Sequence, residues 1–384
     1  MTVRSVAKPN GAPDHYHKLR TEKQPPTMEM KIGKVLQPTP GRGLVIAGPC
    51  SAETEGQVMQ CAKDLAKLNQ VDLFRSGIWK PRTRPGSFEG VGKEGLQWLK
   101  RVKEETGLRT TTEVAKAGHV YDCLKAGIDV LWLGARTTVN PFSVQEVADA
   151  LNGTDIPVLI KNPINPDLGL WQGAVERIYK AGITRIGLIH RGFSYHGKTS
   201  YRNVPRWQMA IEMKRKFPDL QMFVDNSHIC GRRDTLQEVA QEALNLNYDG
   251  LMTEVHPRPD EAWSDAAQQI TPQVFGEMLQ NLRLRKPTAS EVEMADLIEL
   301  RRQIDEVDSD LIGMLGKRMQ LADRIGEFKA ARNIAVLQSD RWDAIMAEAA
   351  KAGSQHGLSE EFMKSYLRAV HQESIDHQDA IVNR

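Results

Sequence analysis

The feature that most constrains the fold is an alternation of short apolar runs with segments long enough for a helix, repeated eight times between residues 31 and 282. The runs are Leu44–Ala47, Leu73–Arg75, Thr110–Glu113, Val130–Leu133, Val158–Lys161, Ile186–Ile189, Gln221–Val224 and Gly250–Glu254. Strands buried on both faces have continuous apolar runs, and strict strand–helix alternation indicates a parallel sheet. Eight such units in about 250 residues predict an α/β fold, the (β/α)8 or TIM barrel. A doubly wound open sheet is the competing architecture.

The pattern changes after residue 282. Residues 283–290 (RLRKPTAS) are basic and contain proline, which predicts a linker. Residues 291–384 have only helical periodicity. Between Leu297 and Phe328 apolar residues recur at spacings of three and four, which predicts one long helix with an apolar seam, interrupted by Arg318.

Two shorter helices are expected to follow. The second is predicted from near Gln338 to before Gly353, and the third begins after Ser359, a good N-cap followed by two glutamates. Three helices, the first very long, cannot enclose a core alone. We therefore predict a small all-α domain that dimerises with a second copy of itself.

Composition narrows the class of protein. The 384 residues are 40% apolar and 26% charged, and 51 basic against 49 acidic side chains leave a net charge of +2. This balance is typical of a globular protein and gives no field for binding nucleic acid or a membrane surface.

Residues 1–30 are polar, without the apolar core of a secretory signal, and are expected to be an extension. Cys50, Cys61, Cys123 and Cys230 are too scattered for a disulfide framework, so we expect a cytoplasmic enzyme.

Two kinds of side chain gather at the predicted C-terminal strand ends, where such barrels carry their active sites. One set offers a sulfur, a nitrogen and two carboxylates, which suits a borderline divalent ion such as Mn, Co, Zn or Fe: Cys50, His228, Glu254 and Asp265. The other set consists of six cations: Arg75, Lys80, Arg82, Arg136, Lys161 and Arg191. Each residue alone is as well explained by a structural role. Together they predict a metal-dependent enzyme with phosphorylated, multiply charged substrates.

The segments GPCS, KPRT, GAR, IKNP, HRG, DNSH and TEVHPRP, in this order, resemble the 3-deoxy-D-arabino-heptulosonate 7-phosphate (DAHP) synthases, which begin the shikimate pathway. The short form of that family, close to the octulosonate 8-phosphate synthases, fits best over residues 30–282. The resemblance implies one divalent metal, for which we favour manganese, held by the four mixed donors. It also implies roles for the cations. The carboxylate side of phosphoenolpyruvate is assigned to Arg75 and Lys80, and its phosphate to Arg136, Lys161 and Arg191.

The same resemblance implies the second substrate and the reaction. Arg82 and Thr83 of KPRT would bind the phosphate of erythrose 4-phosphate, and Glu113 would position the attacking water. Carbon 3 of phosphoenolpyruvate attacks the aldehyde, water adds at carbon 2, and phosphate leaves, with Lys80 and Glu113 as catalytic residues. KPRT in place of a K-A-N-R-S-type segment favours the four-carbon aldose. An octulosonate synthase and a non-catalytic scaffold are the weaker alternatives.

Cations also mark the helical region. Arg301 lies 17 residues before Arg318 and Lys329 lies 11 residues after it, close to five and three helical turns, so we expect all three on nearly one face. Such a stripe suits an extended dianion. On the third helix Ser374 and Gln378, four residues apart, continue the apolar seam.

These positions resemble the all-helical chorismate mutases over residues 291–384. The family's functional set would be Arg301, Arg318, Lys329, Arg341, Ser374 and Gln378, with Lys329 and Gln378 near the ether oxygen. Trp342 and Gln338 stand where the family often has acids. The resemblance implies rearrangement of chorismate to prephenate in an intertwined homodimer, and a place for feedback inhibition by either compound. The alternative is a one-activity synthase whose helical tail serves only regulation and dimerisation.

Overall fold

The computed structural model describes residues 30–80, 86–285, 291–336 and 339–383. The chain divides into two compact units, Met1–Arg285 and Lys286–Arg384. No helix within the described residues is both long and apolar enough to cross a membrane.

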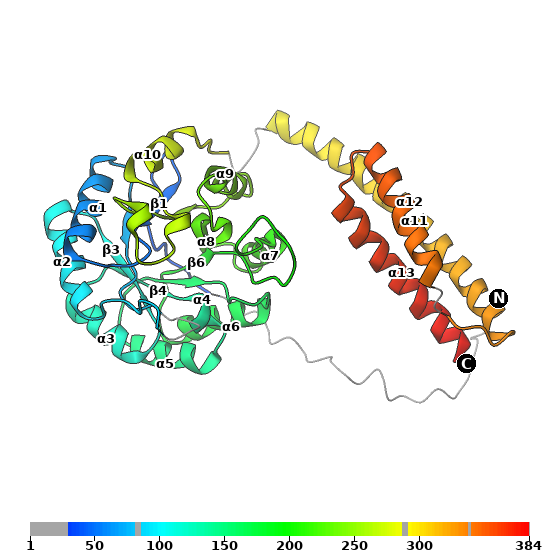
Figure 1. Ribbon diagram of the computed structural model, residues 1–384, viewed down its shortest axis with the longest axis horizontal. Coiled ribbons are helices and arrows are strands. Elements are labelled where there is room, and N and C mark those ends of the chain that lie inside the picture. Colours follow the sequence, from blue (N-terminus) through cyan, green and yellow to red (C-terminus); the bar gives the residue numbers. More distant parts are fainter. Residues whose placement is uncertain (1–29, 81–85, 286–290, 337–338, 384) are drawn as a thin grey trace, which may run out of the picture. The chain divides into compact units, whose positions relative to one another are not determined.

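The first unit is a closed barrel of eight parallel strands in chain order, surrounded by helices (Figure 1). The strands are β1 (Leu44–Gly48), β2 (Leu73–Arg75), β3 (Thr110–Val114), β4 (Val130–Leu133), β5 (Val158–Lys161), β6 (Ile186–His190), β7 (Gln221–Asp225) and β8 (Gly250–Glu254). β8 closes the barrel on β1, with Leu44 opposite Gly250 and Gly48 opposite Glu254. The predicted TIM barrel is thus confirmed, and closure rules out the open doubly wound sheet.

The helices follow the strands that they cover. They are α1 (Glu55–Lys67), α2 (Glu94–Thr106), α3 (Ala117–Ala126), α4 (Ala135–Thr138), α5 (Pro141–Leu151), α6 (Leu168–Lys180), α7 (Trp207–Lys216), α8 (Asn226–Cys230), α9 (Leu236–Asn245) and α10 (Pro272–Asn281). Local sequence signals define where several of these helices begin. Thr271 caps α10 by accepting from Val274 N, and Pro272 occupies the first turn, where a missing N–H costs nothing.

The barrel has two apolar layers. The larger lies between the strands and the helices, and a smaller cluster fills the barrel interior. Val35 and Leu36 close the interior at the N-terminal ends of the strands, where both backbone amides donate to Gln221 Oε1 at 2.8 and 3.0 Å. With that end filled by side chains, the opposite end is the one left to bind substrates.

The second unit consists of α11 (Glu291–Ala330), α12 (Ser339–Gln355) and α13 (Glu360–Val382), with α13 packed along both other helices. Ser359 caps α13 as predicted, accepting from Phe362 N. The prediction that the second helix ends before Gly353 is wrong, because α12 continues to Gln355. A Cβ on Gly353 would lie 2.4 Å from Met363 Cγ, so close packing against α13 favours glycine there, and Gly353 does not mark a helix end.

Apolar side chains of α11 remain exposed, each between 48% and 69%. They are Ile298, Leu300, Ile304, Val307, Leu311, Ile312, Met314, Leu321, Ile325 and Phe328. The other described helices of this unit therefore leave much of the apolar seam of α11 uncovered.

Candidate active sites

Three of the predicted metal donors meet at the C-terminal end of the barrel. Cys50 follows β1, Glu254 ends the neighbouring β8, and Asp265 comes from the loop beyond β8. Their ligand atoms all lie within 4.8 Å of one another, and Cys50 Sγ is 3.1 Å from Asp265 Oδ2. Asp265 has a backbone φ of 50°, an uncommon conformation for a residue other than glycine, which the surrounding contacts must stabilise.

The fourth predicted donor, His228 of α8, lies beside this trio but is not part of the compact set. Its Nδ1 is 3.7 Å from Glu254 Oε1 and 3.0 Å from Asp225 Oδ1. Asp225 therefore occupies Nδ1 and leaves Nε2 as the nitrogen available to a metal. Burial lowers the pKa of His228, against Asp225 and Glu254, which raise it, so the neutral imidazole that ligates metals is favoured.

The residues present fit a divalent cation. Glu254 Oε1 is buried and accepts no hydrogen bond among the described residues. Burial, followed by the charge of Glu254, raises the pKa of the Cys50 thiol to about 12. A bound cation would add to the positive charge that Arg75 and Lys80 place beside these two groups and would favour the Cys50 thiolate.

A further layer of side chains holds the donors, and none of its members was predicted from the sequence. Gln268 Nε2 donates to Glu254 Oε2 at 2.7 Å, and Gln269 Oε1 accepts from Cys50 N at 3.0 Å. Arg202 Nη1 contacts Asp265 Oδ1 at 3.0 Å and Gln268 Oε1 at 2.5 Å. Gln268 and Gln269 follow Asp265 closely in sequence, and this proximity was the one feature of the sequence that could have indicated their role.

Two predicted cations are buried over the same aromatic ring. The guanidinium of Arg75 lies 5.0 Å and Lys161 Nζ 5.7 Å from the ring centroid of Trp132. Arg75 Nη2 is 3.3 Å from Glu254 Oε1, whereas its Nε and Nη1 have no hydrogen-bond partner among the described residues. Lys161 Nζ contacts Asp225 Oδ2 at 2.7 Å. Two unsatisfied donors on a buried guanidinium are what an incoming anion would require.

Lys80 lies over the trio itself, with Nζ 2.8 Å from Cys50 Sγ. Burial lowers its pKa, but Cys50, Glu254 and Asp265 outweigh this and leave the pKa raised. Lys80 is therefore charged at neutral pH.

Other predicted residues complete the mouth of the barrel. The cavity there is lined by Lys80, Glu113, Ala135, Arg136, Lys161, Arg191, Arg202, His228 and Asp265. Burial lowers the pKa of Arg191 to about 10, which still leaves it charged at neutral pH, and its Nη1 donates to Asn203 Oδ1 at 2.7 Å.

Glu113 Oε2 accepts from Trp132 Nε1 at 2.9 Å. A Cβ at residue 134 would meet Glu113 Oε1 at 2.1 Å, so Gly134 makes room for this carboxylate. Arg82 and Thr83 lie outside the described residues.

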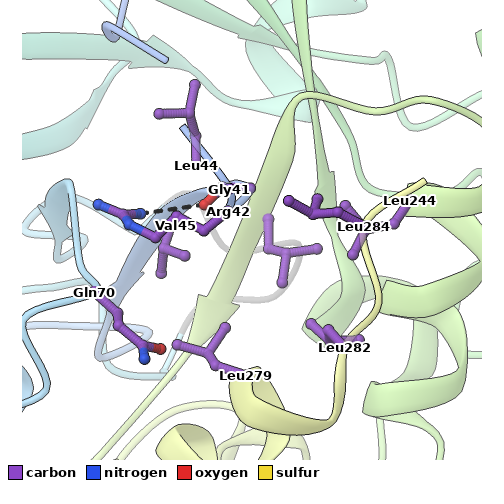
Figure 2. A pocket seen from close by; sticks show the side chains of 11 residues that line it. Gly41, Arg42, Leu44, Val45, Gln70, Leu244, Leu279, Leu282 and Leu284 are labelled. Atoms are coloured by element: carbon purple, nitrogen blue, oxygen red, sulfur yellow. Dashed lines mark hydrogen bonds between the residues drawn. The ribbon is translucent and has the colours of Figure 1, made fainter. Parts of the chain in front are cut away.

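The opposite end of the barrel has a second cavity of about 180 Å³ (Figure 2). Its walls are mostly leucines, including Leu244, Leu279, Leu282 and Leu284. Arg42, the charged group among the described residues of the lining, is paired with Asp72 at 2.6 Å. The described lining offers no group suited to catalysis.

The helical unit has its own cavity, of about 430 Å³. It is lined by Arg318, Leu321, Ala322, Ile325, Lys329, Val336, Ile345, His371, Ser374, Ile375 and Gln378. Arg318 donates to Ser374 Oγ, and Lys329 Nζ donates to Gln378 Oε1 at 3.0 Å. Four of the six residues predicted for this site therefore lie together, with a cation–polar pair at each end.

The other two predicted residues are placed differently. Arg301 is exposed and does not line the cavity. Seventeen residues make about 4.7 turns and about 26 Å of helix, so Arg301 lies off the face and beyond the reach of Arg318. Arg341 and Trp342 are on α12, but their side chains, like the whole of Gln338, lie outside the described residues.

Comparisons with known proteins agree with both resemblances. The family described as "DAHP synthetase I family" matches residues 23–287, and the family described as "Chorismate mutase type II" matches residues 300–379. The chain is 31% identical over 255 residues to a phospho-2-dehydro-3-deoxyheptonate aldolase of Thermotoga maritima, covering 66% of this chain and 71% of that protein. It is 27% identical over 263 residues to a 2-dehydro-3-deoxyphosphooctonate aldolase of Geobacter metallireducens, covering 64% and 92%.

Solved structures agree with the fold. The crystal structure of a Thermotoga maritima phospho-2-dehydro-3-deoxyheptonate aldolase (DAHP synthase) matches with a TM-score of 0.56 and 30% identity, over 63% of this chain and 68% of that one. A truncated form of the Thermotoga maritima 3-deoxy-D-arabino-heptulosonate 7-phosphate synthase matches with a TM-score of 0.54 and 27% identity, over 68% and 88%.

Proposed function

Because the chain belongs to the DAHP synthetase I family and carries a second, chorismate mutase type II domain, we propose that it condenses phosphoenolpyruvate with erythrose 4-phosphate and rearranges chorismate to prephenate. The observation that carries the first activity is the cluster of buried Cys50, buried Glu254 and half-buried Asp265 beneath Lys80 and Arg75. Metal donors and anion-binding cations share one barrel mouth, as a condensation of two phosphorylated substrates requires.

We assign phosphoenolpyruvate to the cations at the barrel mouth. Arg75, whose Nε and Nη1 lack partners among the described residues, and Lys80 would bind its carboxylate. Arg136, Lys161 and Arg191 would bind its phosphate. Holding both ends of the substrate fixes carbon 3 toward the aldehyde, and the same cations stabilise the leaving phosphate.

The metal site would be formed by Cys50, His228, Glu254 and Asp265, with Gln268 and Asp225 fixing the orientation of two of these donors. A divalent ion bound there, for which we favour manganese, supplies Lewis acidity toward the aldehyde oxygen. Glu113, held by the indole of Trp132, would position the water that adds at carbon 2. Arg82 and Thr83 would bind the phosphate of erythrose 4-phosphate, and KPRT supports this aldose over a five-carbon one.

The helical cavity would hold the chorismate dianion in a reactive conformation. Arg318 with Ser374 offers a carboxylate site at one end, and Lys329 with Gln378 offers donors to the ether oxygen at the other. The rearrangement is intramolecular, so conformational restraint and one cation near the breaking bond are sufficient. Arg341 of α12 would add a further cation.

We further propose a homodimer formed through residues 291–384. The exposed apolar side chains of α11 need a cover, and a second copy would supply one. It would also explain Arg301, which lies about 26 Å along the helix from Arg318 and would serve the partner's cavity. Prephenate or chorismate bound in the helical domain would inhibit the barrel, so that a later product controls the first step.

Two single-site variants of the full chain test the pair of activities. Lys161→Ala is expected to abolish phosphoenolpyruvate consumption with erythrose 4-phosphate while chorismate consumption continues. Lys329→Ala is expected to do the reverse. If wild-type protein binds prephenate but does not consume chorismate, the helical domain is regulatory only. If Lys161→Ala condenses its substrates at the wild-type rate, the barrel assignment is wrong.

A further inference from the structure

Three loops at the C-terminal end of the barrel meet beside the proposed metal site. β1 pairs with β2 on one side and with β8 on the other, so the connections that follow these three strands are neighbours. Glu53 belongs to the connection after β1, Phe88 to the one after β2, and Trp263 to the one after β8. None of these three residues has a role in the function proposed so far.

The backbone of the loop after β8 is attached to the connection after β1. Trp263 N donates to Glu53 Oε1 at 2.8 Å, and the hydroxyls of Ser264 and Ser51 are hydrogen-bonded to each other. These bonds fix the two residues that directly precede Asp265. Since Asp265 has a φ of 50°, a conformation that a residue other than glycine keeps only when its surroundings impose it, the two attachments help to hold this metal donor in place.

The side chain of Trp263 contacts the connection after β2. Its ring meets that of Phe88 edge-on, with the ring centroids 5.2 Å apart and an interplanar angle of 85°. This edge-to-face geometry is one of the favourable arrangements of an aromatic pair. Trp263 is nevertheless 56% exposed, so burial in the core does not account for a tryptophan at this position.

Phe88 in turn lies beside a stretch of backbone that is paired with Lys80. Glu89 O, in the residue after Phe88, accepts a hydrogen bond from Lys80 N at 2.8 Å. A Cβ at residue 90 would lie 2.2 Å from Ile78 O, so Gly90, with a φ of 96°, allows the two stretches to approach closely. The position of Phe88 is therefore tied to that of Lys80, the cation that lies over the metal donors.

We propose that Trp263 is a positioning residue of the barrel's active site, whose contact with Phe88 holds the loop of the metal donor Asp265 against the segment of Lys80. The contact joins the side of the site that would bind the metal to the side that would bind phosphoenolpyruvate. This inference rests on the proposed function of the barrel. It makes metal affinity depend on Phe88, which follows a different strand from Asp265 and is far from it in the sequence.

The size of the effect follows from the strength of the aromatic pair. An edge-to-face pair is worth about three- to tenfold in an equilibrium constant. Because the loop must be ordered before Asp265 can bind a metal ion, loss of the pair weakens metal binding by about this factor. Trp263→Ala and Phe88→Ala remove the same contact, so their effects should not multiply when the two changes are combined.

Titration of the metal-free full chain with manganese, followed by the electron paramagnetic resonance signal of free manganese, tests the inference. We compare wild type, Trp263→Ala, Phe88→Ala and the double variant with Trp263→Phe, which keeps an aromatic ring at the contact. Tyr121→Ala is the matched control. Tyr121 is 52% exposed, close to the value for Trp263, and lies on α3, which carries none of the residues assigned to the site.

Both alanine variants and their combination are expected to bind manganese about three- to tenfold more weakly than wild type, whereas Trp263→Phe and Tyr121→Ala stay within about twofold. Wild-type affinity in Trp263→Ala, or a double variant that shows the product of the two single effects, would overturn the inference and leave the proposed metal site standing. If wild type binds no manganese, the proposed metal site fails, and the inference fails with it. If Trp263→Ala does not fold, Phe88→Ala decides, because unchanged manganese affinity in that variant also overturns the inference.

Discussion

Asp225 is the residue whose replacement should most clearly show how the proposed metal site depends on a side chain that does not itself bind the metal. Its carboxylate is fully buried and has three partners. Oδ2 contacts Lys161 Nζ at 2.7 Å, and Oδ1 accepts from His228 N at 3.1 Å and lies 3.0 Å from His228 Nδ1. Asp225 therefore connects a cation assigned to phosphoenolpyruvate with a residue assigned to the metal.

Asp225→Asn removes the charge and keeps the shape. Asparagine remains a good N-cap, so α8 loses little. Lys161, with a side chain only 5% exposed, loses its countercharge, and breaking a buried ion pair costs about 3–5 kcal/mol. Loss of a carboxylate that orients a metal-binding histidine typically costs 10–100-fold in metal affinity, or about 1.4–2.7 kcal/mol.

The assay is titration of the metal-free full chain with manganese, together with thermal unfolding. We expect Asp225→Asn to bind manganese 10–100-fold more weakly and to unfold at a temperature lower by roughly 6–20 °C. The matched control is Asp234→Asn, since that carboxylate is exposed and pairs with Arg232 at the surface. The control should change neither quantity measurably. Manganese affinity within about twofold of wild type in Asp225→Asn would refute this account of the site.

Three further predictions concern other parts of the chain. Gln268→Leu leaves Glu254 Oε2 without its 2.7 Å donor and should weaken manganese binding about tenfold, measured by the same titration; unchanged affinity would show that Gln268 does not hold this ligand. Burial lowers the pKa of His190 to about 4 from 6.5, so the unfolded chain takes up the proton first. The free energy of unfolding should therefore fall by about 3 kcal/mol between pH 6.5 and 4, and His190→Gln should remove that part of the pH dependence in denaturant titrations; equal slopes would contradict it. In sedimentation experiments at micromolar concentration the wild type should be a dimer, and Ile304→Glu with Leu311→Glu should give monomers; a monomeric wild type would contradict the dimer.

The barrel was predictable because its strands are buried on both faces. Continuous apolar runs such as Val158–Lys161 are visible in sequence, and the chain-order barrel follows from their alternation with helices. The donors Cys50 and Glu254 were predictable for the same reason, since each lies at or just after a strand end. Arg318 was conspicuous as a charge in an apolar seam.

The supporting residues could not be found in this way. Arg202 and Gln268 act through side-chain contacts with Asp265 and Glu254, and no periodicity marks such contacts. The contact of Trp263 with the connection after β2 is likewise visible only in the folded chain. The position of Arg301 was predicted by treating 17 residues as close to five helical turns. The actual figure is about 4.7 turns, and the missing fraction of a turn is enough to move the side chain off the expected face.

The most direct test of the central claim is the steady-state rate of phosphoenolpyruvate consumption with erythrose 4-phosphate and manganese, measured with and without a chelator and with and without prephenate. The account predicts consumption that stops with the chelator, returns with manganese, and falls when prephenate is added. The fall should be lost in Arg318→Ala, which leaves the barrel intact. No consumption with erythrose 4-phosphate, or consumption that the chelator does not change, would contradict the account.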